Sequence, residues 1–147
     1  PLYGTVMADM KIVPPPMDQS SSLGGGDLVL VDEYQGGVDS KEAARSAVAG
    51  MGGADLALLA GHGVFVLGST AQAVHLRAVA LEQRCQHAWH VLAAGRQLDT
   101  PVARWWIDRI RHSDGNGFIG FWEAMVRQEL RADPELLEAV TASLTSA

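Results

Sequence analysis

Two apolar runs, Leu56–Ala60 and Val64–Leu67, flank a single Gly-His-Gly unit near the middle of the chain. Short apolar runs bounded by glycine are typical of buried strands, and glycine allows the chain to reverse tightly between them. The pattern therefore predicts two adjoining strands with His62 at their junction, on a scaffold rigid enough to hold a functional side chain. A histidine in such a turn could instead serve only to hydrogen-bond a neighbouring carbonyl group.

A third strand and a helix are predicted before this pair. Leu28–Val31 is another short apolar run, and Asp39 or Ser40 then stands in the position of a helix cap. Gly50 is the expected left-handed terminator of that helix. Strand, helix and strand in this order indicate an α/β fold.

The longest predicted helix begins at Ser69 or Thr70, runs to about Ala94 and is terminated by Gly95. Apolar residues recur along it every three or four positions and form one stripe: Val74, Ala78, Leu81, Cys85, Ala88 and Leu92. Cys85 lies in this stripe, so we interpret it as an inert buried thiol. The helix also carries His75, His87 and His90, which we interpret as solvated or core-edge residues rather than metal ligands, because they lack the carboxylate partner usual on a zinc helix.

Two further segments lack strands. Lys11–Gly26 carries three prolines and ends in three glycines, which predicts a long irregular link. From Pro14 onward its side chains are too small for the link to bury itself, which makes it a candidate for contact with a neighbouring subunit. From residue 96 onward the pattern is helical, with helices expected over Pro101–Arg111 and Phe118–Arg131 and a last one from Pro134. Four aromatic side chains of this tail need a surface to cover, either the chain's own sheet or a subunit interface: Trp105, Trp106, Phe121 and Trp122.

Composition narrows the class of protein. With 147 residues, 48% hydrophobic and 19% charged, the chain is expected to form a single globular domain over residues 1–147, with residues 96–147 as its helical tail. A net charge of −6 argues against binding to nucleic acid or to an anionic membrane. No apolar run has the length of a membrane span, and a single cysteine permits no internal disulfide, so a cytoplasmic location is expected.

Leu58–Gly68, followed by a helical stretch with alanines and Glu82, resembles the class II aldolase/adducin family. The shared order is an apolar strand, His-Gly, a second apolar strand, Gly, and a long helix with Ala and Glu near its middle. The resemblance implies a three-layer class II aldolase-like fold, in which helices flank a central mixed or antiparallel β-sheet and a helical C-terminal tail follows. It also implies that His62 is the late histidine of a three-histidine site for a divalent metal, zinc first, with Fe, Mn or Co as alternatives.

The first residues of the chain also resemble the class II aldolase/adducin family. Pro1, Tyr3 and Gly4 match the family segment that opens a helix directly after a His-x-His pair. We therefore expect the chain to be the C-terminal portion of a longer domain, with that pair and an acidic catalytic residue upstream. In the family's sugar-phosphate aldolases the loop corresponding to Lys11–Gly26 carries a tyrosine that acts at a neighbouring subunit's site. Asp18 stands near that position, so it is the candidate catalytic residue that would supply or relay a proton.

Three imidazoles leave one coordination position of a divalent metal open, and such a metal acts as a Lewis acid towards a carbonyl group. The expected function is therefore a carbon–carbon lyase that works through a metal-stabilised enolate, by aldol cleavage or decarboxylation. Its substrate would be a small hydroxy or keto acid, a sugar-like compound or an aromatic carboxylate. The alternatives are a relative that uses iron for oxygen chemistry and an adducin-like assembly module without metal. The resemblance further implies a homotetramer with sites near subunit boundaries.

Overall fold

The computed structural model describes residues 1–22, 27–32, 40–99, 102–112 and 120–138. The chain forms two compact units, Pro1–Gly117 and Phe118–Ala147, and each is described by itself. Within the described residues no helix is long and apolar enough to cross a membrane. The expectation of a single domain with a tail from residue 96 stays a prediction.

The first unit is built on a three-stranded mixed sheet in the order β1–β2–β3. Strands β1 (Leu28–Val31) and β2 (Leu56–Leu59) are parallel, and Leu28 lies opposite Leu56. Strand β3 (Gly63–Val66) runs antiparallel to β2, with Gly63 opposite Leu59. The three predicted strands are thus confirmed, and so is the predicted mixed sheet.

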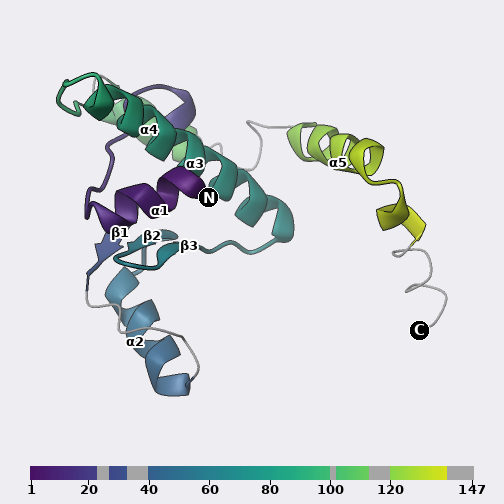
Figure 1. Ribbon diagram of the computed structural model, residues 1–147, viewed down its shortest axis with the longest axis horizontal. Helices are drawn as coiled ribbons and strands as arrows, with labels where there is room; N and C mark the ends of the chain where they lie inside the picture. Colours follow the sequence, from purple (N-terminus) through teal and green to yellow (C-terminus); the bar gives the residue numbers. More distant parts are fainter. Residues whose placement is uncertain (23–26, 33–39, 100–101, 113–119, 139–147) are drawn as a thin grey trace. The chain divides into compact units, whose positions relative to one another are not determined.

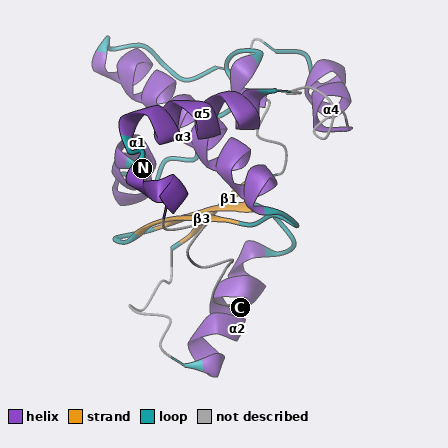
Figure 2. Cartoon of the chain, turned by 90° about the vertical axis from the view of Figure 1, so that its right-hand side faces the viewer, coloured by secondary structure: helices purple, strands orange, loops and turns teal. Residues whose placement is uncertain are grey.

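The two faces of the sheet carry separate cores because successive side chains of a strand point to opposite sides. Leu56 and Leu58 face the larger core, together with Met7, Leu81 and Cys85 from two helices. On the opposite face a smaller core contains Met51, Ala57 and Leu59, with Val29, Val31 and Phe65 packed against it. Figure 2 shows the resulting three layers, with helices α1 and α3 on one side of the sheet and α2 on the other. This is the layered architecture expected from the sequence.

Helices α1 (Leu2–Asp9) and α3 (Ala71–Ala93) cover the larger core and lie side by side (Figure 1). The side chain of Thr70 caps α3 by accepting from the backbone N–H of Ala73 over 3.1 Å. Gly95 follows the helix at φ 70, in the left-handed region where glycine carries no steric cost. Start, length and stop of the longest helix are therefore confirmed.

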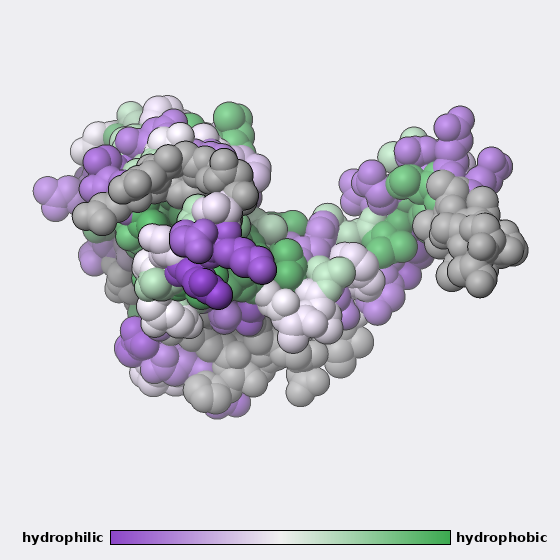
Figure 3. All heavy atoms as spheres, turned by 90° about the horizontal axis from the view of Figure 1, so that it is seen from below, coloured by the Kyte–Doolittle hydropathy of each residue, from purple (hydrophilic) through white to green (hydrophobic). Residues whose placement is uncertain are grey.

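Helix α2 (Lys41–Met51) covers the smaller core and begins, as predicted, after the cap Ser40. The predicted terminator was wrong by two positions, because the left-handed residue is Gly52 at φ 58 and Gly50 remains within the helix. Gly50 meets a packing need instead, since a β-carbon there would lie 3.2 Å from Cγ1 of Val31. Hydrophilic side chains gather on the α2 end of this unit when it is viewed from below (Figure 3).

The irregular link between α1 and β1 packs closely on the rest of its unit. Pro14, Met17 and Ser21 are buried, and a short 3-10 helix, η1 (Ser20–Ser22), contacts α3. The expectation that the segment from Pro14 onward is too poor in large side chains to bury itself was therefore wrong for these residues. Residues 23–26 lie outside the described part of the chain.

Helix α4 (Arg104–His112) starts three residues later than expected and contacts η1. Ile107 is buried whereas Trp105 is 65% exposed, and the two tryptophans Trp105 and Trp106 meet edge to face at 5.4 Å between ring centroids. The predicted first residue of the helix, Pro101, lies outside the described residues.

The second unit contains helix α5 (Phe121–Ala132), which starts three residues later and ends one residue later than the predicted helix Phe118–Arg131. Phe121 and Trp122 are partly buried within it. Residues 135–138 form a helical turn where a last helix was expected, and the remainder of that helix lies beyond the described residues.

Candidate active site

His62 lies in the turn between β2 and β3. Its backbone N–H donates to the carbonyl oxygen of Leu59 over 3.0 Å, and Gly61 adopts φ 72, which a side chain would disfavour. The side chain of His62 is exposed, although the strands on either side of it are anchored by the buried residues Leu58 and Leu59. A rigid hairpin thus presents this imidazole at the surface, and its position at the junction of two strands is the predicted one.

The first turn of α1 packs against the same hairpin. A β-carbon on Gly4 would lie only 2.7 Å from Cγ1 of Val64, so glycine allows the helix to approach the strand this closely. A β-carbon on Gly63 would lie 3.6 Å from Oγ1 of Thr5. Gly63 directly follows His62, so the beginning of α1 is held next to the histidine turn.

Glu82 fastens that helix end to α3. Its Oε1 accepts from the backbone N–H of Tyr3 and its Oε2 from that of Gly4, both at 2.9 Å. The first N–H groups of a helix have no partner within the helix, and a carboxylate there also complements the positive end of the helix dipole. Sequence reasoning placed Glu82 in the family pattern but assigned it no function, because its partners lie about 80 positions away.

The structure supplies one candidate metal ligand at this place. Among the described residues, no three His, Cys, Asp or Glu side chains come together as a group that could hold a metal ion. An exposed imidazole on a rigid turn is a suitable donor for a divalent ion, but it fills only one coordination position. His62 therefore fits a metal site as one ligand among others, since the described residues do not supply a complete group.

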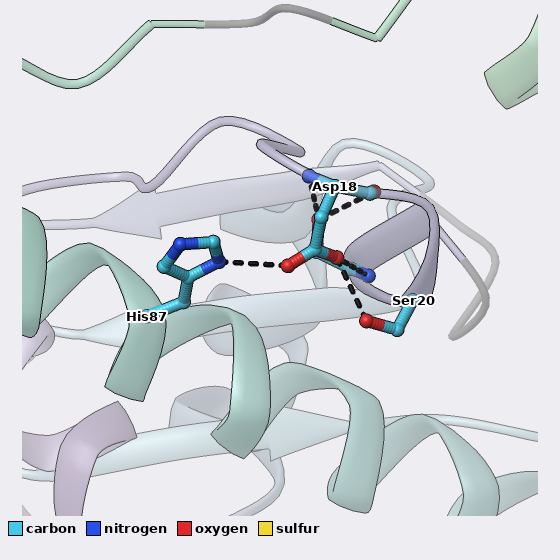
Figure 4. Close-up of polar contacts among 4 residues, drawn as sticks. Asp18, Ser20 and His87 are labelled. Carbon is cyan, nitrogen blue, oxygen red and sulfur yellow. Dashed lines mark hydrogen bonds and ion pairs between the residues drawn. The ribbon is translucent and has the colours of Figure 1, made fainter.

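Asp18, the candidate catalytic residue, forms an ion pair with His87 of α3. Its Oδ2 lies 2.7 Å from Nδ1 of His87, while its Oδ1 accepts from the hydroxyl of Ser20 at 2.8 Å and from the backbone N–H of Ser21 at 2.6 Å (Figure 4). Partial burial raises the pKa of Asp18, but the hydrogen bonds from Ser21, Ser20 and His87 outweigh it and lower the pKa below its usual value. Asp18 is therefore a carboxylate at neutral pH.

The loop that carries Asp18 is fixed to α3 at a second point. The guanidinium Nε of Arg84, a buried side chain, donates to the carbonyl oxygen of Pro14 over 2.7 Å. Arg84 and His87 are three residues apart and so lie on one face of α3. These two contacts explain why a segment poor in large side chains is ordered. The sequence offered no signal for either, since 70 and 69 positions separate the partners.

Three other reactive or basic side chains, Cys85, His90 and Arg77, take part in packing or pairing within the fold. Cys85 is buried, as expected, and burial raises the pKa of its thiol to about 12, which favours an inert thiol. The ring of His90 packs on Tyr3 with 6.1 Å between centroids. Arg77 pairs with Asp55 at 3.1 Å and also donates to the carbonyl oxygen of Leu67. The two contacts of Arg77 connect α3 to the open end of the β2–β3 hairpin, which is the end opposite His62.

Of the arginines near the tryptophans, Arg104 pairs with Asp108 at 3.0 Å within α4, and Arg109 is exposed. The side chain of Arg111 lies outside the described part. Arg104 is thus paired within its own helix, and Arg109 is exposed to solvent.

Comparison with known proteins agrees with this geometry. Residues 1–89 match the family model described as "Class II Aldolase and Adducin N-terminal domain". The chain belongs to the class II aldolase and adducin family. The match includes α1, the sheet, the His62 turn and α3 as far as Trp89.

Solved structures with the same fold include the following two. One is an aldolase II superfamily protein from Pseudomonas syringae, 24% identical, with a TM-score of 0.69 over 89% of this chain and 54% of that one. The other is an L-fuculose 1-phosphate aldolase, 20% identical, with a TM-score of 0.62 over 76% of this chain and 50% of that one. This chain thus spans about half the length of each. No curated protein matches it.

Proposed function

We propose that His62 is one ligand of a divalent metal site in a carbon–carbon lyase of the class II aldolase kind. The observation that carries the proposal is the exposed imidazole on the hairpin beside the first turn of α1. By resemblance to the family, the residues that precede Pro1 would contribute the other two histidines. Gly4, Thr5 and Glu82 fix the start of α1 beside the His62 turn. Residues that directly precede Pro1 would therefore lie close to His62.

A divalent ion at this site, zinc by preference and Fe, Mn or Co as alternatives, would supply Lewis-acid chemistry towards a carbonyl-containing substrate. In that chemistry this chain would hold one metal ligand, His62, in a rigid position and would supply a group that transfers a proton. We propose that Asp18 contributes to proton transfer together with His87, with which it pairs at 2.7 Å.

The substrate classes follow from the reaction. Aldol cleavage needs a hydroxyl group on the second carbon from a carbonyl, as in a hydroxylated keto acid or a sugar-like compound. Decarboxylation needs a carboxylate next to the carbon that will accept a proton, as in a hydroxylated aromatic carboxylate. Detection of an aldehyde or of carbon dioxide as product distinguishes the two.

Two other functions belong to different classes. An iron-dependent oxygenase would consume oxygen in proportion to product, which a lyase does not. An adducin-like assembly module would bind no metal stoichiometrically. An imidazole held on a rigid exposed turn favours a metal enzyme, because an assembly module has no need of a ligand there.

The test of the metal assignment is His62→Ala in the complete protein. We expect the variant to keep its circular dichroism spectrum and the melting temperature of the zinc-free wild type, because an exposed side chain itself contributes little to stability. Its bound zinc, measured by mass spectrometry of metals, should fall from stoichiometric to background, and turnover should be lost with it.

A matched control is His90→Ala, which removes another exposed imidazole but one that packs on Tyr3. We expect this control to retain its metal. Stoichiometric zinc in the His62→Ala protein would overturn the proposed function.

We also propose a homotetramer, as the family resemblance implies. The exposed Trp105 supports a subunit contact through α4.

A further inference from the structure

The strongest feature outside the His62 turn is the pair formed by Asp18 and His87. Because Asp18 is ionised, it can only accept a hydrogen bond, so Nδ1 of His87 must carry the hydrogen. This fixes the neutral imidazole as the tautomer whose Nε2 is the basic atom. In Figure 4, Nε2 points away from Asp18.

Asp18 is itself badly placed to transfer a proton. Its Oδ1 is held by Ser20 and Ser21 and its Oδ2 by His87. A carboxylate with both oxygens engaged and a lowered pKa carries no proton to give at neutral pH. What it can do is orient an imidazole and stabilise the imidazolium, as the third group does in a nucleophile–base–carboxylate arrangement.

The surroundings make the pair rigid and leave it accessible. Arg84 anchors the loop one helical turn away, and Ser20 and Ser21 orient the carboxylate. The side chain of His87 nevertheless remains 43% exposed, and that of Asp18 36%. An oriented carboxylate, a fixed tautomer and an exposed second nitrogen are together the features of a general acid–base group.

We propose that Nε2 of His87 is the proton-transferring atom of this enzyme and that Asp18 is its positioning residue. The inference rests on the proposed lyase function and assigns its proton transfer to a side chain that the sequence suggested was merely solvated. The substrate class that suits it is one with an ionisable hydroxyl group or a carbon that must gain a proton.

In aldol cleavage, the lone pair of Nε2 takes the proton of the substrate hydroxyl. The O–H electron pair then forms the new C=O bond, the C–C bond breaks, and its electron pair passes to the carbon beside the original carbonyl. The imidazolium returns its proton to that carbon, so no external oxidant or reductant is needed. In decarboxylation, the C–C electron pair stays on the carbon that loses carbon dioxide, and the imidazolium protonates that carbon.

Of the described charged and titratable groups, Asp18 of the loop contacts His87, and Arg84 and His90 lie one turn away on α3. From α4, which contacts η1, the structure describes Arg104 and Asp108, which pair with each other, and the exposed Arg109. Asp18 therefore provides the contact that sets the tautomer of His87.

The test is His87→Gln in the complete, zinc-loaded protein. A glutamine amide can still donate a hydrogen bond to Asp18, so it keeps the loop in place, but it cannot transfer a proton. The assays use a hydroxylated keto acid, a sugar-like hydroxy-ketone and a hydroxylated aromatic carboxylate as probes. We expect unchanged zinc content and melting temperature, and a kcat lower by about 10²- to 10⁴-fold.

The pH profile distinguishes a His87 that transfers protons from a His87 that only holds the loop in place. If aldol cleavage is the reaction, the acidic limb of kcat/KM should disappear in His87→Gln, because the wild-type base is lost by protonation there. If decarboxylation is the reaction, the alkaline limb should disappear. His90→Gln, three residues along the same helix, is the matched control and should keep both its rate and its profile.

Wild-type kcat and an unchanged pH profile in His87→Gln would overturn the inference. Should that variant fail to fold, Asp18→Asn provides the second test, because an amide no longer dictates which ring nitrogen carries the hydrogen. A full rate in Asp18→Asn would also overturn it. The metal assignment fails separately, through zinc retention in His62→Ala, so the two failures are distinguishable.

Discussion

Asp18 shows how local hydrogen bonds decide the charge of one side chain. Burial alone would favour its neutral form, whereas the donors from Ser21, Ser20 and His87 favour the carboxylate and prevail. A carboxyl group whose pKa is lowered by folding stabilises the folded state at every pH above its unfolded value. That contribution is lost as the pH falls through the folded pKa.

The first prediction at this scale concerns Asp18→Asn and pH. The wild-type protein should exceed the variant in free energy of unfolding above pH 3.8, the unperturbed value of the carboxyl group, and this difference should shrink as the pH falls further. Urea denaturation of both proteins across that range measures it. A difference that grows on acidification would contradict the lowered pKa.

Sequence reasoning at the residue scale succeeded where the signal was local. His62 between two glycines and Thr70 before a helix are visible in a few neighbouring positions, and both lie where they were expected. The pairing of Asp18 with His87 could not be foreseen, because it depends on how the loop docks on α3. The same holds for Glu82, whose partners belong to another helix.

At the scale of elements, helix α1 depends on contacts made by its neighbours. It is eight residues long, too short to be stable in isolation, and its cap residue Pro1 makes no side-chain hydrogen bond to it. Glu82 replaces the missing cap from α3, and Gly4 lets the helix touch β3. The start of α1 is therefore defined by tertiary contacts more than by its own sequence.

We accordingly expect Glu82→Gln to destabilise the protein. An amide can accept from only one of the two N–H groups of Tyr3 and Gly4, and it brings its own NH₂ against the other. The free energy of unfolding should fall by about 0.5–2 kcal/mol, the range for loss of a helix cap. Chemical denaturation measures it, and a change within experimental error would show that the cap contributes nothing.

Glu129→Gln provides the control for that substitution. It replaces an exposed carboxylate on α5 and should alter stability by no more than about 0.5 kcal/mol. In both variants amide hydrogen exchange locates the effect. Faster exchange at the first turn of α1 is expected for Glu82→Gln alone.

The strands and most helix ends were predictable for a physical reason. Short apolar runs between glycines can hardly be anything but buried strands, and caps are chosen by local hydrogen bonding. The end of α2 was misplaced because Gly50 and Gly52 are both plausible terminators in the sequence. Only the close approach of Val31 reveals that Gly50 is needed for space. Packing therefore distinguishes Gly50 from Gly52, which the sequence alone does not.

At the scale of the whole molecule, the remaining question is how exposed apolar side chains are covered. Trp105 is 65% exposed beside the partly buried Trp106. Contact of so large an apolar side chain with water is unfavourable. The link that was expected to seek a neighbouring subunit is instead buried in part on its own chain, so it no longer argues for assembly. The case for an oligomer therefore rests on α4 and on the family resemblance.

The last prediction is that Trp105→Gln weakens assembly of the complete protein. Sedimentation velocity over a range of concentrations should show wild-type tetramers that persist on dilution, and smaller species for the variant at the same concentrations. The control is Val48→Gln on α2, another apolar residue that is 62% exposed, which should sediment like the wild type. Activity should fall with the tetramer if sites lie near subunit boundaries, even though His62 is untouched. A wild-type monomer at micromolar concentration that retains full activity would exclude such shared sites, and His87 would then have to serve the His62 site of its own chain.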